Sequence, residues 1–230
     1  MTKASLRAVG SPALGDSEAA ARVNRNGIEP RPSSLPTATA ENYDGGRFSN
    51  YPMNHVVPTD AELASFNSYS DNQWFMSTGK ITGRFTGTTD EILQWGAHKW
   101  GWEEDVVRAV AVKESNYNQG AYTWLGSNQY HQGGGITSIT WSQNPGSWPL
   151  GAKSTAFNVD VFLAYMRTCF DGKETWMNNT GDAGQPYAAG DMWGCVGRWY
   201  AGRWYTPEAK WYIGEIKRVL AERTWEAAGY

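Results

Sequence analysis

The chain has 230 residues, of which 40% are hydrophobic and 19% are charged, so it can bury the core of one sizeable domain or of two small ones. Its 20 lysines and arginines against 23 aspartates and glutamates give a formal net charge of −3, which argues against a nucleic acid or an anionic membrane as its partner. No stretch approaches the roughly 18 to 20 apolar residues of a spanning helix, so we expect no membrane span.

Residues 1–58 differ in composition from the rest of the chain. They hold six of the ten prolines and none of the 13 tryptophans, and they show no apolar periodicity. Such a segment cannot offset its ordering entropy by burial, so we expect a tail or linker that is poorly structured or draped over the domain near Tyr43, Phe48 and Tyr51. Residues 59–230 are predicted to form a single domain.

The first helical signals lie between residues 88 and 115. Thr88 and Glu91 have the spacing of a capping box, and the apolar residues that follow them end at Gly101, which predicts a helix over 88–100. Three consecutive acids, at 103–105, predict the first turn of a second helix, because the positive end of the helix dipole stabilises acidic side chains there. The valines that follow form the apolar stripe of this helix.

Three more helices are predicted in the second half of the chain. One covers 155–170, a shorter one covers about 191–200, and the last begins at Thr206-Pro207-Glu208, which combines a capping residue, a proline at the first position and an acid. The glycine-rich and aromatic-rich residues 115–153 are expected to be loop with one short β element around 135–141. The fold class predicted is mainly α.

Glu114 is the residue that points most directly to chemistry. It follows Val106, Val107 and Val110 by eight, seven and four positions, so helical spacing places its carboxylate on the apolar face. Burial raises the pKa of a carboxyl and keeps it protonated near neutral pH, as a general acid requires. The alternative is that Glu114, at the helix end, faces solvent or pairs locally with Lys113 or an arginine.

Four segments follow one another in an order that is found in a known enzyme family. Residues 111–117 read Ala-Val-Lys-Glu-Ser-Asn-Tyr, 134–139 read Gly-Gly-Ile-Thr-Ser-Ile, 158–166 begin with Asn-Val-Asp, and 199–202 read Trp-Tyr-Ala-Gly. Together they resemble goose-type lysozymes and soluble lytic transglycosylases, of which this chain would be a divergent member. The resemblance implies a lysozyme-like single domain with a small β insertion, which cleaves β-1,4 links between amino sugars, as in peptidoglycan or chitin.

The resemblance also nominates site residues. It makes Glu114 the catalytic acid and then base, and it implies that a hydroxyl near Trp199 supports Glu114, so we expect a hydrogen bond from Tyr200. Trp199 is then either part of the substrate groove or part of the core. The nominated substrate-binding set is Ser115, Gly135, Thr137, Ser138, Trp141, Asn158, Trp199 and Tyr200.

A hydrolase of this kind usually has a second carboxylate, about 5 Å from the first when it retains configuration and further when it inverts it. The candidates are Asp160 and Asp191, with Glu174 and Glu208 behind them. Asp160 also fits a solvated helix face, and Asp191 also fits a helix cap. The absence of a clear partner fits a transglycosylase, in which the substrate's N-acetyl group assists and an anhydro sugar forms, and fits equally an inverting enzyme with its base on a loop.

The cysteines indicate the cellular compartment of the protein, and the histidines indicate whether a metal site is expected. Cys169 and Cys195, 26 residues apart, are the only cysteines, and their spacing suits a disulfide better than a metal site, although two buried thiols are the alternative. We therefore expect a secreted protein whose signal peptide has been removed. His55, His98 and His131 are too scattered for a metal site, so we expect no metal and no cofactor.

The aromatic residues favour a polysaccharide as the binding partner. We expect the protein to be a monomer. The 13 tryptophans and 12 tyrosines outnumber the 7 phenylalanines, and such rings stack on sugars while their N–H and O–H groups bond hydroxyls. A tryptophan-rich core is the other interpretation. The rival function is a carbohydrate-binding protein without catalysis, which would keep Trp124, Trp141 and Trp148 but gain nothing from a carboxylate on an apolar face.

Overall fold

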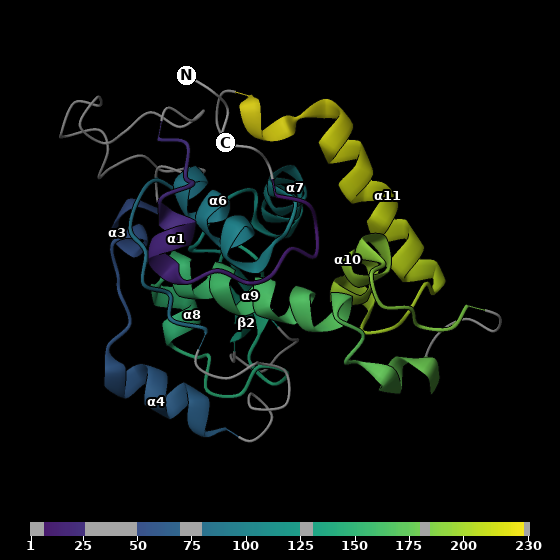
Figure 1. The fold of residues 1–230 in the computed structure, drawn as a ribbon, viewed down its shortest axis with the longest axis horizontal. Helices are drawn as coiled ribbons and strands as arrows, with labels where there is room; N and C mark the ends of the chain where they lie inside the picture. Colours follow the sequence, from purple (N-terminus) through teal and green to yellow (C-terminus); the bar gives the residue numbers. More distant parts are fainter. Residues whose placement is uncertain (1–6, 26–49, 70–79, 125–130, 180–184, 228–230) are drawn as a thin grey trace.

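The computed structural model describes residues 7–25, 50–69, 80–124, 131–179 and 185–227, and over these residues the chain is mainly helical (Figure 1). None of the helices described is long and apolar enough to cross a membrane. In chain order the elements are α1 (Asp16–Ala20), α3 (Tyr51–Asn54), α4 (Asp60–Ser68), α6 (Thr89–Trp100), α7 (Glu104–Ser115), β1 (Tyr122–Trp124), β2 (His131–Gly134), β3 (Ile139–Thr140), α8 (Leu150–Lys153), α9 (Thr155–Phe170), the 3-10 helix η3 (Thr175–Asn179), α10 (Met192–Ala201), α11 (Pro207–Glu222) and the 3-10 helix η4 (Thr224–Glu226).

Helix α9 runs through the middle of the molecule, with α6 packed along it (Figure 1). Nearly every residue of α9 is buried, and all of α6 is buried. The two helices approach closely at Gly96, where a Cβ atom would lie 2.6 Å from Val159 Cγ1. Helix α7 packs on α6 and on α11, and α10 packs on both α11 and α9.

The five helices expected from the sequence between residues 88 and 222 are present, with ends set by the predicted signals. Thr88 and Glu91 form a capping box, and Gly101 ends α6 with φ 65°. Thr206 caps α11 by accepting a hydrogen bond from the Ala209 amide, and Pro207 occupies its first turn. These ends depend on residues that are neighbours in the chain, which is why the pattern predicts them.

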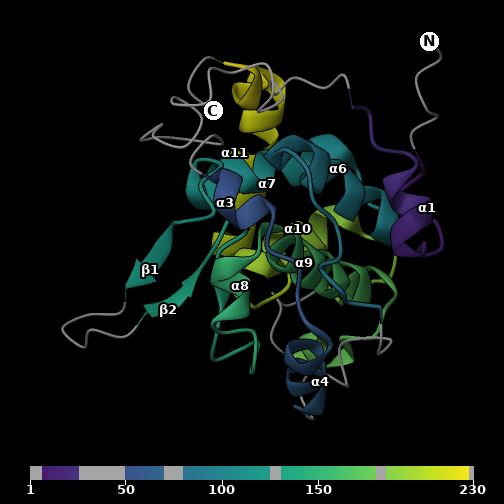
Figure 2. The same cartoon turned by 90° about the vertical axis from the view of Figure 1, so that its left-hand side faces the viewer.

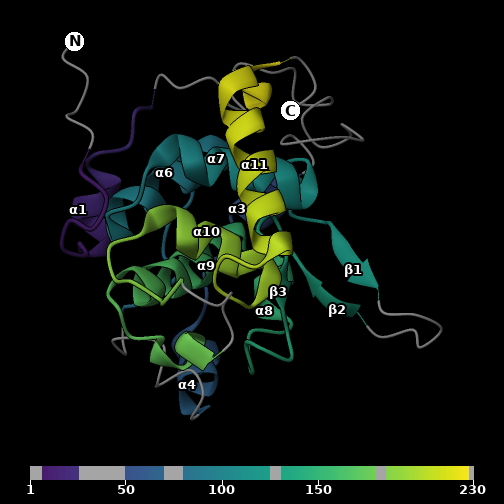
Figure 3. The ribbon, with the colours of Figure 1, turned by 90° about the vertical axis from the view of Figure 1, so that its right-hand side faces the viewer.

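The β structure is larger than expected. Three short strands form an antiparallel sheet in the order β1-β2-β3, whereas the sequence predicted one element around residues 135–141 (Figure 2 shows β1 and β2, and Figure 3 shows all three strands). Tyr122 pairs with Gly134, which in turn pairs with Ile139. A Cβ atom on Gly133 would lie 2.6 Å from the Ile139 carbonyl oxygen, so glycine is required for this close pairing. Glycines carry no apolar alternation, and the pattern therefore missed β2.

The described parts of residues 1–58 lie against the helical domain. Ala19 of α1 is fully buried, the Leu14 amide donates to the Lys99 carbonyl oxygen at 2.7 Å, and Asp16 pairs with Lys99 at 2.8 Å. Asn50, also fully buried, donates from Nδ2 to the Tyr117 carbonyl oxygen at 2.7 Å. These stretches are thus draped over the domain. The expected contacts of Tyr43 and Phe48 fall outside the described residues, while Tyr51 begins α3 and is half-buried.

The predicted disulfide is confirmed. Cys169 near the end of α9 and Cys195 in α10 are bonded, with an S–S distance of 2.02 Å, and both are buried. The alternative of two free thiols is therefore wrong. The bond ties α10 to the central helix, and α10 in turn packs on α11, which faces the end of α7.

Candidate active site

Glu114 lies in the last turn of α7, where its side chain is half-buried. The helix ends at Asn116, which has φ 53° and whose amide donates to the Val112 carbonyl oxygen at 2.9 Å. The Tyr117 amide donates to the Ala111 carbonyl oxygen at 3.1 Å. This left-handed turn carries the chain away from the helix axis, so Glu114 stands at the edge of the packed helices with its backbone held.

The carboxyl of Glu114 accepts a hydrogen bond from the hydroxyl of Tyr212, a residue of α11 that is 1% exposed. Burial raises the pKa of Glu114 from 4.5 to about 7, against the opposing effects of the Tyr212 hydrogen bond and of the charge on Lys113. The same burial and the neighbouring carboxylate raise the pKa of Tyr212 well above 10. At neutral pH the pair therefore consists of a neutral phenol and a carboxyl that is close to half protonated.

Such a carboxyl can both give and take a proton. A group whose pKa lies near the working pH supplies the acid and the base in comparable amounts, which is the condition for general acid and base catalysis by one residue. The alternative of a Glu114 that faces solvent is not what the structure shows, because the side chain is half-buried and hydrogen-bonded to Tyr212. Its hydrogen-bond partner is Tyr212 on α11, while Lys113, the local partner considered from the sequence, pairs with Glu215 at 3.0 Å.

Tyr200 does not make the hydrogen bond that was expected of it. It is 52% exposed and stacks on Tyr212, with ring centroids 4.9 Å apart and an angle of 3° between the planes. Tyr212 therefore supplies the hydroxyl, and Tyr200 supplies an exposed ring beside it. Tyr212 lies on the buried face of α11 with Ile216 and Val219. The signal available was that a buried tyrosine needs a partner for its hydroxyl.

Several residues nominated to bind substrate instead hold the chain next to Glu114. Thr137 and Asn158 are fully buried, and the Thr137 hydroxyl donates to Asn158 Oδ1 at 2.7 Å. Gly135 is buried with φ 80°, and a Cβ atom there would lie 2.0 Å from Asn158 Nδ2. The Ser115 hydroxyl lies 2.9 Å from the Ile136 carbonyl oxygen. The predictions of direct sugar contact by Thr137, Asn158 and Gly135 are therefore wrong, because these groups are already packed and bonded.

The buried amide of Asn158 is the centre of this support. Its Oδ1 also accepts from the Thr137 amide at 3.0 Å, and its Nδ2 donates to the carbonyl oxygens of Gly134 and Gly151 at 3.1 and 2.9 Å. Gln119, which is also fully buried, accepts from the Ile136 amide at 2.9 Å. Asn158 of α9 thus fixes the segment that follows β2. This segment in turn contacts Ser115, the neighbour of Glu114.

The remaining nominated residues are spread over two regions. Ser138 is half-buried with φ 56° in the turn before β3. Trp199 is half-buried and packs edge-on against Phe162, with centroids 4.8 Å apart, so it belongs to the margin of the core. Trp141 is half-buried and lies 5.1 Å from the ring of Trp148, which is 45% exposed. The side chain of Trp124 lies outside what the structure describes.

Both main candidates for a second carboxylate are engaged in structural contacts. Asp160 is fully buried, with Lys99 Nζ and Trp100 Nε1 each 2.6 Å from its carboxylate oxygens, so the expectation of a solvated helix face is wrong. The partners come from α6, which packs on that face of α9. Asp191 caps α10 by accepting from the Gly194 amide at 2.9 Å, as its position suggested. Glu174 is likewise buried, in an ion pair with Arg198.

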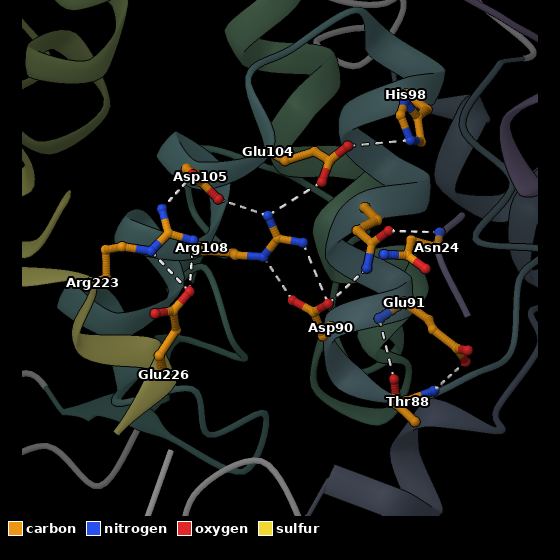
Figure 4. A network of polar contacts seen from close by, with 11 residues as sticks. Asn24, Thr88, Asp90, Glu91, His98, Glu104, Asp105, Arg108, Arg223 and Glu226 are labelled. Atoms are coloured by element: carbon orange, nitrogen blue, oxygen red, sulfur yellow. Dashed lines mark hydrogen bonds and ion pairs between the residues drawn. The ribbon is translucent and has the colours of Figure 1, made fainter. Parts of the chain in front are cut away.

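A network of charges that the sequence did not reveal holds the other end of α7 (Figure 4). Arg108 of α7 donates from Nε to Asp90 of α6 at 2.7 Å and from Nη1 to Asp105 at 2.8 Å. Glu104 lies 3.3 Å from His98, whose pKa is lowered to about 4, mainly by burial. The network fixes how α7 lies on α6, and therefore where the helix presents Glu114. No group of three or more metal-ligating side chains occurs among the described residues.

Comparison with known proteins gives no match to a protein family, to a curated protein or to a solved structure.

Proposed function

We propose that this chain is a glycan-cleaving enzyme with a divergent lysozyme-like domain over residues 59–230, in which Glu114 is the general acid and base. The substrate is a polysaccharide of β-linked amino sugars, such as peptidoglycan or chitin. The observation that carries the proposal is the pairing of Glu114 with Tyr212, which gives a carboxyl with a pKa of about 7 beside exposed aromatic rings. The disulfide is compatible with action outside the cytoplasm.

In the proposed reaction the carboxylic acid of Glu114 gives its proton to the glycosidic oxygen as the bond between that oxygen and the anomeric carbon breaks. The carboxylate that remains then takes a proton from the nucleophile that attacks the anomeric carbon. Water as nucleophile gives hydrolysis, whereas a hydroxyl of the same sugar gives an anhydro product. Tyr212, a positioning residue, donates to Glu114 Oε1 and stabilises the carboxylate formed after the first step.

The engagement of Asp160 and Asp191 in structural contacts favours a mechanism with one protein carboxylate. In such a mechanism the N-acetyl group of the substrate stabilises the positive charge at the anomeric carbon. Mass spectrometry of the products decides the outcome, since an anhydro product is lighter than the hydrolytic product by one water molecule.

The direct test is Glu114→Gln, assayed on a panel of peptidoglycan, chitin, chitosan and other bacterial or fungal glycans. The amide keeps the shape and still accepts a hydrogen bond from Tyr212, so the fold and glycan binding are retained, while activity falls by at least about 100-fold. The matched control is Glu222→Gln, an exposed residue at the end of α11. A Glu114→Gln protein that cleaves at the wild-type rate would refute the mechanism.

The alternative is a carbohydrate-binding protein without catalysis, which the exposed rings of Tyr200 and Trp148 favour. Such a protein binds glycans equally well with glutamate or glutamine at position 114, and neither form releases products from any glycan of the panel. The two functions are therefore separated by the wild-type protein alone.

A further inference from the structure

The last turn of α7 carries an ammonium and a carboxyl on adjacent residues, Lys113 and Glu114, and both contact α11 (Figure 3 shows the two helices). Glu114 accepts a hydrogen bond from Tyr212, whereas Lys113 Nζ lies 3.0 Å from Glu215 Oε2. Because Tyr212 and Glu215 are three residues apart on a helix, they are neighbours on one face of α11. The turn is thus joined to this helix by two separate polar contacts.

Two groups of α11 hold the ammonium of Lys113. One is the carboxylate of Glu215, whose pKa is lowered by hydrogen bonds from Lys113 and Arg218, so that it is charged at neutral pH. The other is the ring of Trp211, whose centroid lies 4.7 Å from Lys113 Nζ. Within the described part of the chain, the carboxylate that pairs with Lys113 is Glu215 and not the adjacent Glu114.

The position of this ammonium matters for Glu114. The charge on Lys113 lowers the pKa of Glu114 and so opposes the larger effect of burial. Lysine has a flexible stem of four carbons, so an ammonium that loses its partner on α11 is free to move toward another carboxylate. Glu114, the next residue in the chain, offers one. An ion pair there would favour the charged form of Glu114, which has no proton to give to a leaving group.

The other charged or titratable groups that pack near α7 have partners of their own. Tyr200 of α10 stacks on Tyr212, and Arg218 of α11 bonds both Glu215 and Glu222, at 3.3 and 2.8 Å. The groups that α6 and η4 present to α7 pair with one another or with residues 104–108, at the start of the helix (Figure 4); they are Asp90, His98, Arg223 and Glu226. The cation whose charge acts on Glu114 is therefore Lys113.

We propose that Glu215 is a positioning residue for Glu114. Together with the ring of Trp211 it holds the ammonium of Lys113 on α11. The carboxyl of Glu114 then meets the hydroxyl of Tyr212 instead of a cation. This inference rests on the proposed function, because it takes Glu114 as the acid and base of the reaction, and it gives Glu215 a role that is exerted through Lys113.

The experiment measures the pKa of Glu114 by carbon-13 NMR of the full chain, labelled at its glutamate carboxyls. The signal of Glu114 is the one that is lost in Glu114→Gln. Glu215→Gln keeps the size of the side chain but cannot hold the ammonium, and it lowers the pKa of Glu114 by about half a pH unit or more. Glu215→Asp keeps the charge on α11 and recovers at least half of this shift.

A second background separates the position of the ammonium from the loss of charge at residue 215. A lost charge acts on Glu114 whether or not a lysine is present, so its effect is equal in the wild-type and the Lys113→Met proteins. If the ammonium moves, the shift caused by Glu215→Gln is less than half as large in Lys113→Met. The matched control is Glu222→Gln, because Glu222 bonds Arg218 as Glu215 does, whereas the ion pair of Lys113 is with Glu215.

The control should leave the pKa of Glu114 within about 0.2 pH units of wild type. Equal shifts from Glu215→Gln in the two backgrounds overturn the inference, as does a shift no larger than that of the control. Thermal melting shows that each variant is folded.

The cleavage assay separates this inference from the proposed function. If glycan is cut, the alkaline limb of the activity profile moves down with the pKa in Glu215→Gln, and activity at pH 8 falls about threefold; a limb that stays in place refutes the positioning role. If the pKa shifts as expected but no glycan of the panel is cut, the placement of the ammonium by Glu215 stands and the proposed function is refuted. If glycan is cut but the pKa does not shift, only the inference is refuted.

Discussion

The pKa of Glu114 can be tested through stability, without any knowledge of the substrate. The carboxyl has a pKa of about 7 in the folded protein against 4.5 as its ordinary value, a rise of about 2.5 pH units. Below pH 4.5 Glu114 is protonated in both the folded and the unfolded protein, so its contribution to the free energy of unfolding does not change with pH. Between pH 4.5 and 7 the unfolded chain loses its proton while the folded protein keeps it, so the free energy of unfolding falls as pH rises.

The loss of stability is complete about one pH unit above the pKa of the folded protein, near pH 8. One pKa unit corresponds to 1.36 kcal/mol, so the rise of about 2.5 units removes about 3 kcal/mol from the stability of the wild-type protein. Glu114→Gln has no such titration and keeps an acceptor for Tyr212. The variant should therefore gain about 3 kcal/mol relative to wild type between about pH 4 and pH 8.

Urea unfolding of both proteins at several pH values measures this difference. Other groups that titrate in this range, such as His98 and Glu104, are present in both proteins, and their effects cancel in the comparison. Glu222→Gln, on the exposed end of α11, is the control and should follow wild type at every pH. A stability difference for Glu114→Gln that changes by less than about 1 kcal/mol over the range would show that the carboxyl is not held protonated.

Further outcomes test the surroundings of Glu114. Tyr212→Phe removes a hydrogen bond that stabilises the carboxylate, so the pKa of Glu114 rises and the alkaline limb of the activity profile moves up by about one pH unit; an unmoved limb would contradict the role of Tyr212. Asp160→Asn leaves Lys99 buried without its closest carboxylate and should cost about 3 to 5 kcal/mol in urea unfolding, whereas a catalytic Asp160 would lose activity at unchanged stability. Reduction of the bond between Cys169 and Cys195 should lower stability by about 3 kcal/mol, checked by melting with and without reductant.

The sequence by itself determined the helices that carry the site, because their ends depend on neighbours in the chain. The capping box of Thr88 and Glu91, the left-handed Gly101 and the pair Thr206-Pro207 each act over three or four residues. The same local periodicity put Glu114 on the apolar face of its helix, which is enough to single it out. The sequence left each cysteine only one possible partner, and the structure decided that the two form a bond rather than remain buried thiols.

The tertiary structure alone decided what each polar side chain meets. Tyr212 reaches Glu114 from 98 residues away, and Lys99 reaches Asp160 from 61 residues away. A helical pattern shows which face is buried but not which polar groups the opposing helix presents there. For this reason the hydroxyl was assigned to Tyr200, Asp160 was placed in solvent, and Thr137 and Asn158 were taken for substrate contacts. Burial of a polar group is stable only when its partner lies opposite, and that condition is set between elements that local sequence does not connect.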